Sequence, residues 1–504
     1  MHGLIGGVRT KTSWWRSKLV SELAGLQWIT CFVFNEILRA RRKQGKETYC
    51  CFLDIRKAYD TVFRDGLRYR LLEAGLRGKL WRVLRNLYSI VESCVLVGKD
   101  RTEWFSLGDG LRQGCILSPV LFAIFIDGLA RAVKNAKTCE ILEKLKLNIL
   151  LFADDALLLA SSPQELQFLL DLVFQHSEKW RFKFNIQKSK AMVFKGRKPA
   201  RKLSFFLGLQ ELEIVESLKY LGVDFASNWS WSVTKKRFAK KARSRLAFLS
   251  KAIFDGIASD AVENLWRTIV RPTLEYGCEI WGGGKWLEAE RIQSKAGRKL
   301  LGVGGKTTGE AVRGELGWWS MRGRRDLCRL RFFGKIARMG GEKLLKQVFD
   351  LCKPITGNMP TTWCGSTRKL LFDLCLGHVW SSESVGPAKD WEKVISASLR
   401  AREVHEWKEG LQRKSKLRLY RTLKNDLRRE SYLTLPLESR RKLTEMRSGT
   451  HSLRIETGRW EKEPLEQRIC KVCVCGSIED ELHVLLDCYP YAALRNVPDN
   501  PGQD

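Results

Sequence analysis

Three aspartates stand inside otherwise apolar segments of the chain. Asp54 follows the run Tyr49-Cys50-Cys51-Phe52-Leu53, and Asp154 and Asp155 interrupt the apolar segment 149–159. A carboxylate buried in such surroundings costs several kcal/mol unless a cation or hydrogen bonds compensate it. A lone aspartate of this kind is more often a turn or ion-pair residue, but the set of three favours metal ligands.

The chemistry that fits these carboxylates is phosphoryl transfer. If the two segments form adjacent strands, about 4.8 Å apart, Asp54 and Asp154 can hold two Mg²⁺ or Mn²⁺ ions roughly 3.5–4 Å from each other. One ion would activate a 3′-hydroxyl for attack on an α-phosphate, and the other would stabilise the leaving pyrophosphate. Ligands that are all oxygen favour Mg²⁺ or Mn²⁺ over zinc at this site.

A second candidate metal site lies near the C-terminus. Cys470, Cys473, His483 and Cys488 have the residue types and spacing of a small zinc site, and Cys475 is a substitute ligand. The alternative is a set of unrelated buried cysteines with a surface histidine. A closed site with four ligands would be structural and would hold a loop that contacts RNA or target DNA.

The elements that must position the aspartates can be read from apolar spacing. Residues 28–45 predict a helix that ends at Gly45, and residues 49–55 predict a strand covered on both faces. Ser118 is the expected N-cap of a buried helix that continues through Pro119. The segment 149–159 predicts two antiparallel strands that turn at the aspartates.

A capping box, Ser162-Pro163-Gln164-Glu165, precedes an apolar stripe at helical spacing and predicts an amphipathic helix. From about residue 46 to 195 the order is then strand, helices, strand pair, helix and strand. This order indicates an α+β fold, with helices on one face of an antiparallel sheet.

The composition points to a polyanionic partner. The chain has 504 residues, 44% of them apolar, so it can form roughly three or four structural units. Lys and Arg outnumber Asp and Glu by 89 to 56, which gives a formal charge of +33. Nucleic acid is the favoured partner, and a ribosomal-type or membrane-surface protein is the alternative.

The region beyond about residue 235 is basic and helical, and two stretches concentrate the charge. They are either solvated helix faces or a phosphate-binding surface. Residues 352–400 show no clear periodicity and predict a linker or an irregular helix. The basic residues of the two stretches are Arg324, Arg325, Arg329, Arg331, Lys335 and Arg338, then Arg413, Lys414, Lys416, Arg418, Arg421, Lys424, Arg428 and Arg429.

The cysteine pattern and the hydropathy predict an intracellular protein, nuclear or cytoplasmic and not secreted. The 15 cysteines lack the spacing of a disulfide scaffold, and no secretory signal is found. The longest apolar candidate, residues 148–161, is shorter than the roughly 18–20 residues of a membrane span and contains two aspartates, so no membrane partner is expected.

Several of these segments resemble, in the same order, the sequence blocks of reverse transcriptases from non-LTR (long interspersed) retrotransposons. The run 51–60 resembles the first palm block, which implies that Asp54 is a metal ligand and that Tyr59 is the aromatic gate against a ribose 2′-hydroxyl. The run 111–119 resembles the nucleotide- and template-positioning block, which implies roles for Arg112, Gln113 and Gly114, although Ile116 stands where proline is more common.

The later blocks continue the resemblance. Phe152-Ala153-Asp154-Asp155 looks like the catalytic turn, which implies that Asp154 is the second principal ligand and Asp155 a supporting one. The run 185–190 implies that Lys188 protonates the leaving pyrophosphate. Residues 266–281 look like the thumb, and the Cys/His cluster looks like the terminal zinc knuckle of such proteins. The remaining block, which resembles the primer grip, is Tyr220, Leu221 and Gly222.

The resemblance implies a right-hand polymerase palm with partial fingers, a helical thumb and a basic helical C-terminal region. The function implied is that of an RNA-directed DNA polymerase that uses Mg²⁺ or Mn²⁺, an RNA template, a DNA primer or target, and deoxynucleoside triphosphates, with Zn²⁺ at the C-terminus. The domains implied are partial fingers at 1–45, palm at 46–210, primer grip and thumb at 211–345, a basic helical linker region at 346–460 and the knuckle at 461–495.

Members of this family carry a longer fingers region before the first palm block, where this chain has only about 50 residues. The expected glycine-and-arginine stretch ahead of the helix at residue 28 is degenerate in Gly6-Gly7-Val8-Arg9, which predicts an N-terminally truncated copy. The alternative function is therefore a catalytically impaired, nucleic-acid-binding remnant of such an element. A maturase of the group II intron type shares the palm, but the Cys/His cluster fits the retrotransposon pattern better.

Overall fold

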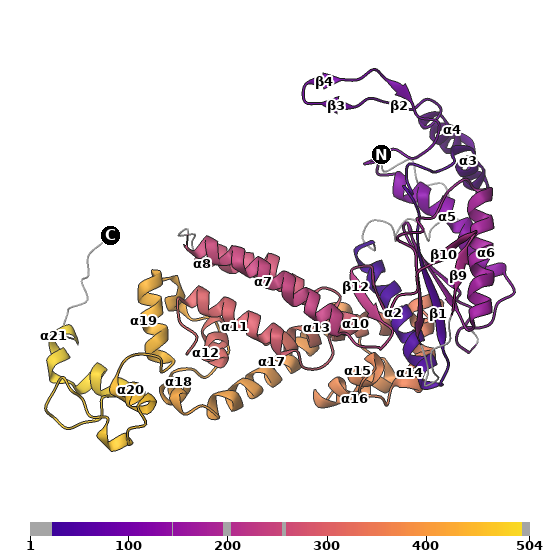
Figure 1. The fold of residues 1–504 in the computed structure, drawn as a ribbon. Helices are drawn as coiled ribbons and strands as arrows, with labels where there is room; N and C mark the ends of the chain where they lie inside the picture. The colour runs from indigo at the N-terminus through magenta and orange to yellow at the C-terminus, as the bar shows by residue number, and fades with distance from the viewer. Residues whose placement is uncertain (1–22, 144, 195–202, 255–258, 496–504) are drawn as a thin grey trace. The chain divides into compact units, whose positions relative to one another are not determined.

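The computed structural model describes residues 23–143, 145–194, 203–254 and 259–495, and the chain divides into two compact units (Figure 1). The first unit comprises residues 1–234 and 336–369, and the second comprises residues 235–335 and 370–504. The segment Gly6-Gly7-Val8-Arg9 lies outside the described residues.

The core of the first unit is an antiparallel sheet of four strands, in the order β6-β7-β1-β8. The predicted strand pair at residues 149–159 is confirmed, and its turn consists of Ala153 and Asp154, so that Asp155 already belongs to the second strand. The strands are β1 (Thr48–Asp54), β6 (Ile149–Phe152), β7 (Asp155–Ala160) and β8 (Lys190–Phe194).

Both faces of this sheet are covered, so the prediction of helices on one face is wrong. Cys51 and Leu53 of β1 belong to a core that also contains residues of α3, α5 and α6. On the other face, Phe34 of α2 meets Phe52 edge to face at 5.7 Å. Alternate residues of a strand point to opposite faces, so a strand that is apolar at every position needs cover on both.

The predicted helices of the first unit form, with one change at a cap. Ser162 Oγ accepts a hydrogen bond from the Glu165 N–H at 3.1 Å, and Glu165 accepts one from the Ser161 N–H at 2.7 Å, so the capping box is confirmed. Ser118 is the first helical residue and not the N-cap, and its hydroxyl donates to the Arg112 carbonyl at 2.6 Å. The helices are α2 (Leu23–Lys43), α3 (Arg64–Glu73), α4 (Gly78–Leu87), α5 (Ser118–Asn135), α6 (Pro163–Lys179) and α14 (Leu344–Thr356).

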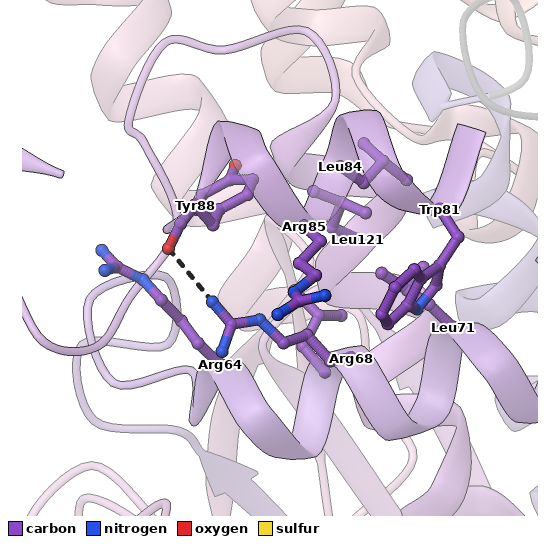
Figure 2. A pocket seen from close by; sticks show the side chains of 9 residues that line it. Arg64, Arg68, Leu71, Trp81, Leu84, Arg85, Tyr88 and Leu121 are labelled. Carbon is purple, nitrogen blue, oxygen red and sulfur yellow. Dashed lines mark hydrogen bonds between the residues drawn. The ribbon is translucent and has the colours of Figure 1, made fainter. Parts of the chain in front are cut away.

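Helices α3 and α4 enclose a small cavity of about 10 Å³ (Figure 2). Leu71, Trp81 and Leu84 give it apolar walls, and the Arg68 guanidinium donates to the Tyr88 carbonyl at 3.4 Å. Four short strands follow α4 as nested hairpins. They are β2 (Glu92–Ser93), β3 (Leu96–Val97), β4 (Asp100–Arg101) and β5 (Phe105–Ser106).

Two further hairpins complete the first unit. The second of them joins Tyr220 to Val223 through Leu221 and Gly222, whose φ angles are 46° and 83°. Glycine adopts such a φ without strain, whereas leucine there is held by the pairing on either side. The strands are β9 (Phe205–Leu207), β10 (Gln210–Leu212), β11 (Ser217–Tyr220) and β12 (Val223–Ala226).

The regular elements named in the described part of the second unit are all helices. Helix α7 (Ser232–Phe254) starts at its boundary, and α13 (Met321–Ala337) and α15 (Trp363–Asp373) cross into it. Its longer members are α11 (Leu287–Leu301), α12 (Gly309–Leu316), α17 (Ala388–Gln412) and α19 (Leu437–Arg447). Shorter ones are α8 (Ser259–Leu265), the π-helix η1 (Trp266–Val270), α9 (Arg271–Glu275), α10 (Cys278–Trp281), α16 (Gly377–Ser382), α18 (Arg418–Leu423), α20 (Arg454–Trp460) and α21 (Ala492–Arg495).

The prediction of a linker or irregular helix at residues 352–400 is wrong, because most of this segment lies in regular helices. Helix α17 has a buried stripe in which each member follows the last by four residues. Glu403 interrupts the stripe, and its carboxylate accepts hydrogen bonds from the Ser320 N–H and hydroxyl, both at 2.7 Å. The stripe consists of Trp391, Ile395, Leu399, Glu403, Trp407 and Leu411.

The two basic stretches are largely engaged within the protein. Arg325 is buried and donates to the carbonyls of Gly282 and Gly284 at 3.1 and 3.2 Å. Ion pairs join Arg324 to Glu275, Arg331 to Glu392, Arg418 to Glu481, Lys424 to Glu430, and Arg429 to Glu263. Among the described helices, none is long and apolar enough to cross a membrane.

Candidate functional site

The pairing of β1 with β7 brings the three aspartates to one end of the sheet. Asp54 lies directly opposite Asp155 in the register, and directly opposed residues project from the same face. Asp154 lies in the turn just before β7, and its carbonyl accepts a hydrogen bond from the Ile55 N–H at 3.4 Å. The backbone therefore places these three residues at the same end of the sheet.

The electrostatics of this site show that negative charge is incompletely compensated. Burial raises the pKa of Asp155 to about 6, and the charges of Asp154 and Asp54 add to this effect. Burial also raises the pKa of Asp54, with Lys188 opposing and Asp154 reinforcing it. Mutual repulsion of this kind is what a bound cation relieves, and carboxylate oxygens are ligands that divalent ions accept, although the oxygens of the three aspartates do not gather as closely as the ligand atoms of the Cys/His cluster described below.

Lys188 lies at this site, with its Nζ 3.7 Å from Asp54 Oδ2 and its side chain largely exposed. The loop that carries it is tied to the end of β1, because the Asn185 N–H donates to the Asp54 carbonyl at 2.7 Å. Ser189 is fully buried and accepts a hydrogen bond from the Asp54 N–H at 3.2 Å. Sequence reasoning gave Asn185 and Ser189 no role, although both stand in the block that contains Lys188.

The run 111–119 packs beside Tyr59. The Tyr59 ring stacks on Phe122 at 5.2 Å, and burial together with the charge of Asp154 raises its pKa. The Leu111 N–H donates to the Tyr59 carbonyl at 2.7 Å, and Gln113 Nε2 donates to Asp60 at 2.7 Å.

The three candidate residues at the start of this run are exposed. Arg112, Gln113 and Gly114 lie on the surface, and Gly114 has a φ of 80°. A positive φ and an open surface leave room for a ligand to approach the backbone here.

The residues predicted as the primer grip have two different environments. Tyr220 is buried, with its ring 5.1 Å from Phe52, and burial raises its pKa far above 10. Among the described residues its hydroxyl has no hydrogen-bond partner. Leu221 and Gly222 form the turn, and both are partly exposed.

The Cys/His cluster also comes together. The ligand atoms of the four predicted residues, Cys470, Cys473, His483 and Cys488, all lie within 4.8 Å of one another, which no other set of three or more such groups matches in the described part of the chain. Cys473 Sγ lies 3.3 Å from His483 Nε2. Cys475 stays at the edge of the cluster, 4.0 Å from His483 Nε2, as a substitute ligand would.

Comparison with known proteins relates the aspartate site to one family. The family described as reverse transcriptase (RNA-dependent DNA polymerase) matches residues 13–225, a range that includes the three aspartates, Tyr59, Lys188 and the Tyr220 hairpin.

Named relatives come from insect mobile elements. A Pol polyprotein of the type-1 element R2 from Nasonia vitripennis is 29% identical over 39% of this chain and 20% of its own length. The R2 polyprotein of Popillia japonica is 26% identical over 53% of this chain and 45% of its own. The polymerase of the mobile element jockey from Drosophila melanogaster is 24% identical over 50% of this chain and 28% of its own.

This chain thus spans less than half the length of these three relatives. Among solved structures, a telomerase from Candida albicans in complex with a fragment of telomeric RNA is 11% identical. The match covers 64% of this chain and 54% of the telomerase chain. Its TM-score of 0.28 is too low to support the fold. Residues 13–225 of this chain are therefore similar to the reverse transcriptase family, and the three relatives are proteins of retrotransposable or mobile elements.

Proposed function

We propose that this chain is an RNA-directed DNA polymerase of a non-LTR retrotransposon, which adds deoxynucleotides to a primer 3′-hydroxyl on an RNA template. The observation that carries the proposal is the placement of Asp54 opposite Asp155, with Asp154 in the adjoining turn, at the shared end of β1 and β7. The family match over residues 13–225 supports it.

Asp54 and Asp154 are the proposed principal ligands of two Mg²⁺ or Mn²⁺ ions, and Asp155 supports them. When bound, such ions supply activation of the attacking hydroxyl and neutralisation of the leaving pyrophosphate. Asn185 and Ser189 hold the backbone of Asp54 from the opposite side, which keeps the carboxylate in place whether or not a metal is bound.

Other residues around the aspartates would handle the nucleotide. Lys188 is exposed beside Asp54 and can donate a proton to the departing pyrophosphate. Tyr59, whose pKa the charge of Asp154 raises, would exclude a ribose 2′-hydroxyl with its ring. Arg112, Gln113 and Gly114 would contact the incoming nucleotide and template, and the Leu221–Gly222 turn would contact the primer.

The division into palm, partial fingers and helical thumb is part of this proposal. The four-stranded sheet with α5 and α6 would form the palm. Residues 266–281, which begin with the π-helix η1, would contribute to the thumb.

The Cys/His cluster is proposed as a Zn²⁺ site. Three thiolates and one imidazole at mutual distances within 4.8 Å match the softer ligands that zinc prefers, and four protein ligands close the coordination shell. The site would be structural and would shape the loops around residues 470–488 for contact with RNA or target DNA.

Primer extension tests the polymerase proposal. The purified chain, an RNA template, a DNA primer and Mg²⁺ should give extension with deoxynucleotides, and Asp154→Ala should abolish it. Asp171→Ala, which removes an exposed aspartate on α6, is the matched control and should extend normally.

Two outcomes of this assay would contradict the proposal. Extension that survives Asp154→Ala would place catalysis elsewhere. Salt-sensitive RNA binding without any incorporation, equal in wild type and Asp154→Ala, would identify the chain as a binding remnant.

A further inference from the structure

The second unit contains a pocket that the polymerase chemistry does not use. Its volume is about 430 Å³, within the usual range for small-ligand sites of roughly 300–1,000 Å³. Residues of η1, α9, α11, α13 and α17, together with the loop before α13, line it. The lining residues used below are Trp266, Arg267, Arg271, Gln293, Trp318 and Trp319.

Aromatic rings give this pocket a flat apolar surface. Trp266 and Trp318 are buried and stacked, with ring centroids 5.2 Å apart and an interplanar angle of 13°. Trp319 is partly exposed beside them. Indole surfaces of this kind bind the faces of nucleobases, since every base has a π-face.

Arginines give the same pocket an excess of positive charge. Arg267 pairs with Glu263 at 2.5 Å, Arg324 pairs with Glu275, and Arg271 lies 3.8 Å from Glu275. Three guanidinium groups thus face two carboxylates. Burial lowers the pKa of Arg271, and Arg324 and Arg267 lower it further, although Glu275 opposes them, so an anion here would be stabilised.

Within the described residues, two buried polar atoms of the pocket have no hydrogen-bond partner. Gln293 is 2% exposed, and its Nε2 donates to the Trp319 carbonyl at 2.9 Å, which fixes the amide. The two atoms are Gln293 Oε1 and Arg271 Nε. An acceptor and a donor left buried in this way are costly unless a ligand satisfies them.

We propose that this pocket binds one unpaired nucleotide, with the base against Trp319 and Gln293 and the phosphate on Arg267 and Arg271. Gln293 Oε1 would accept a hydrogen bond from a ring or exocyclic N–H of the base. The site is separate from the aspartates and goes beyond the proposed polymerase function. The same chemistry is offered by a nucleotide of a single strand and by a free nucleotide.

Photocrosslinking and calorimetry test this proposal with the full chain carrying Asp154→Ala, so the result does not depend on polymerisation. The probe is a 5′-phosphorylated, single-stranded trinucleotide with 5-iodouracil at its centre. We expect binding at one site and a crosslink in the peptide that contains Trp318 and Trp319. A crosslink confined to residues 51–60 or 111–119 would overturn the proposal.

Substitutions in the pocket should weaken trinucleotide binding. Gln293→Met keeps the side-chain volume and removes the acceptor, and Arg267→Gln removes one charge. Each should raise Kd about tenfold, as expected for one lost hydrogen bond to a charged or buried group. Arg131→Gln is the matched control, because Arg131 is similarly exposed and also pairs with a carboxylate four residues earlier. Its Nε lies 2.7 Å from Asp127 Oδ2. This substitution should leave Kd unchanged. Equal Kd values for all four proteins would refute the site.

Further titrations distinguish a free nucleotide from a nucleotide of a single strand, and they show whether the base itself is bound. Adenosine monophosphate that binds as tightly as the trinucleotide would assign a free nucleotide, and tighter trinucleotide binding would assign a strand. A blunt duplex should not compete with the trinucleotide. An abasic trinucleotide with full affinity would overturn the base contact.

Discussion

The aspartate site and the Cys/His cluster are both candidate metal sites, but they are built in different ways. Asp54 and Asp155 are paired residues of a four-stranded sheet, and a buried core on both faces holds their strands together. The four residues of the Cys/His cluster lie on short helices and loops between residues 470 and 488. A sheet can hold its ligands without an ion, whereas loops of this kind depend on the ion for their shape.

Zinc removal should show the difference between the aspartate site and the Cys/His cluster most clearly. Structural zinc contributes roughly 10–16 kcal/mol of apparent binding energy at neutral pH, so Cys473→Ser or a strong chelator should unfold residues 461–495. Limited proteolysis should then cut this segment while β1 and β7 stay protected, and metal analysis should fall from one zinc per chain towards none.

Cys375→Ser, which changes an exposed cysteine outside the cluster, is the control for zinc removal and should retain both the metal and the protection. If residues 461–495 stay protected from proteolysis without zinc, these loops keep their structure without the ion.

Substitution of the aspartates should have the next largest effect. Asp54→Asn should lower primer extension about a thousandfold, or about 4 kcal/mol, because it removes a principal ligand. Asp155→Asn should lower primer extension roughly tenfold to a hundredfold, which is the usual loss when a residue that supports the metal ligands is changed. Neither should unfold the sheet, and circular dichroism checks this. Equal losses for the two variants would contradict the separate roles.

Glu36 offers a smaller test, because it is a buried carboxylate without a candidate metal. Asn35 Nδ2 donates to it at 2.7 Å and the Cys364 thiol at 3.3 Å, and burial raises its pKa to about 7. The folded protein therefore binds more protons than the unfolded chain between about pH 4.5 and pH 7. The unfolding free energy should fall by about 3 kcal/mol as the pH rises through this window.

Glu36→Gln removes this titration. We expect the variant to match the wild type near pH 4 and to be more stable by about 3 kcal/mol at pH 8, as measured by urea denaturation at both values. Glu178→Gln, on the exposed face of α6, should follow the wild-type profile. Parallel pH profiles for wild type and Glu36→Gln would show that Glu36 does not carry the effect.

Local patterns in the sequence predicted the part of the fold that positions the aspartates. The unbroken apolar run before Asp54, the strand pair around Asp154 and the Ser162 capping box each have a short-range physical cause, and all three formed. The Cys/His spacing likewise predicted the residues that now cluster.

Features that depend on distant partners were not predictable. Helix α17 was missed because its stripe advances by four residues at each step and contains Glu403, whose partner Ser320 is 83 residues away in sequence. The burial of Arg325 depends on carbonyls more than 40 residues earlier. Cover on the second face of the sheet comes from α2, which itself packs against α14 from the other end of the first unit's sequence.

The internal use of arginine and lysine in the second unit changes what the charge of +33 means. Arg324, Arg331, Arg418, Lys424 and Arg429 already neutralise carboxylates of the same chain. Only basic groups that meet phosphates displace condensed counterions when nucleic acid binds. The ionic-strength dependence of binding should therefore correspond to far fewer phosphate contacts than the number of basic residues suggests.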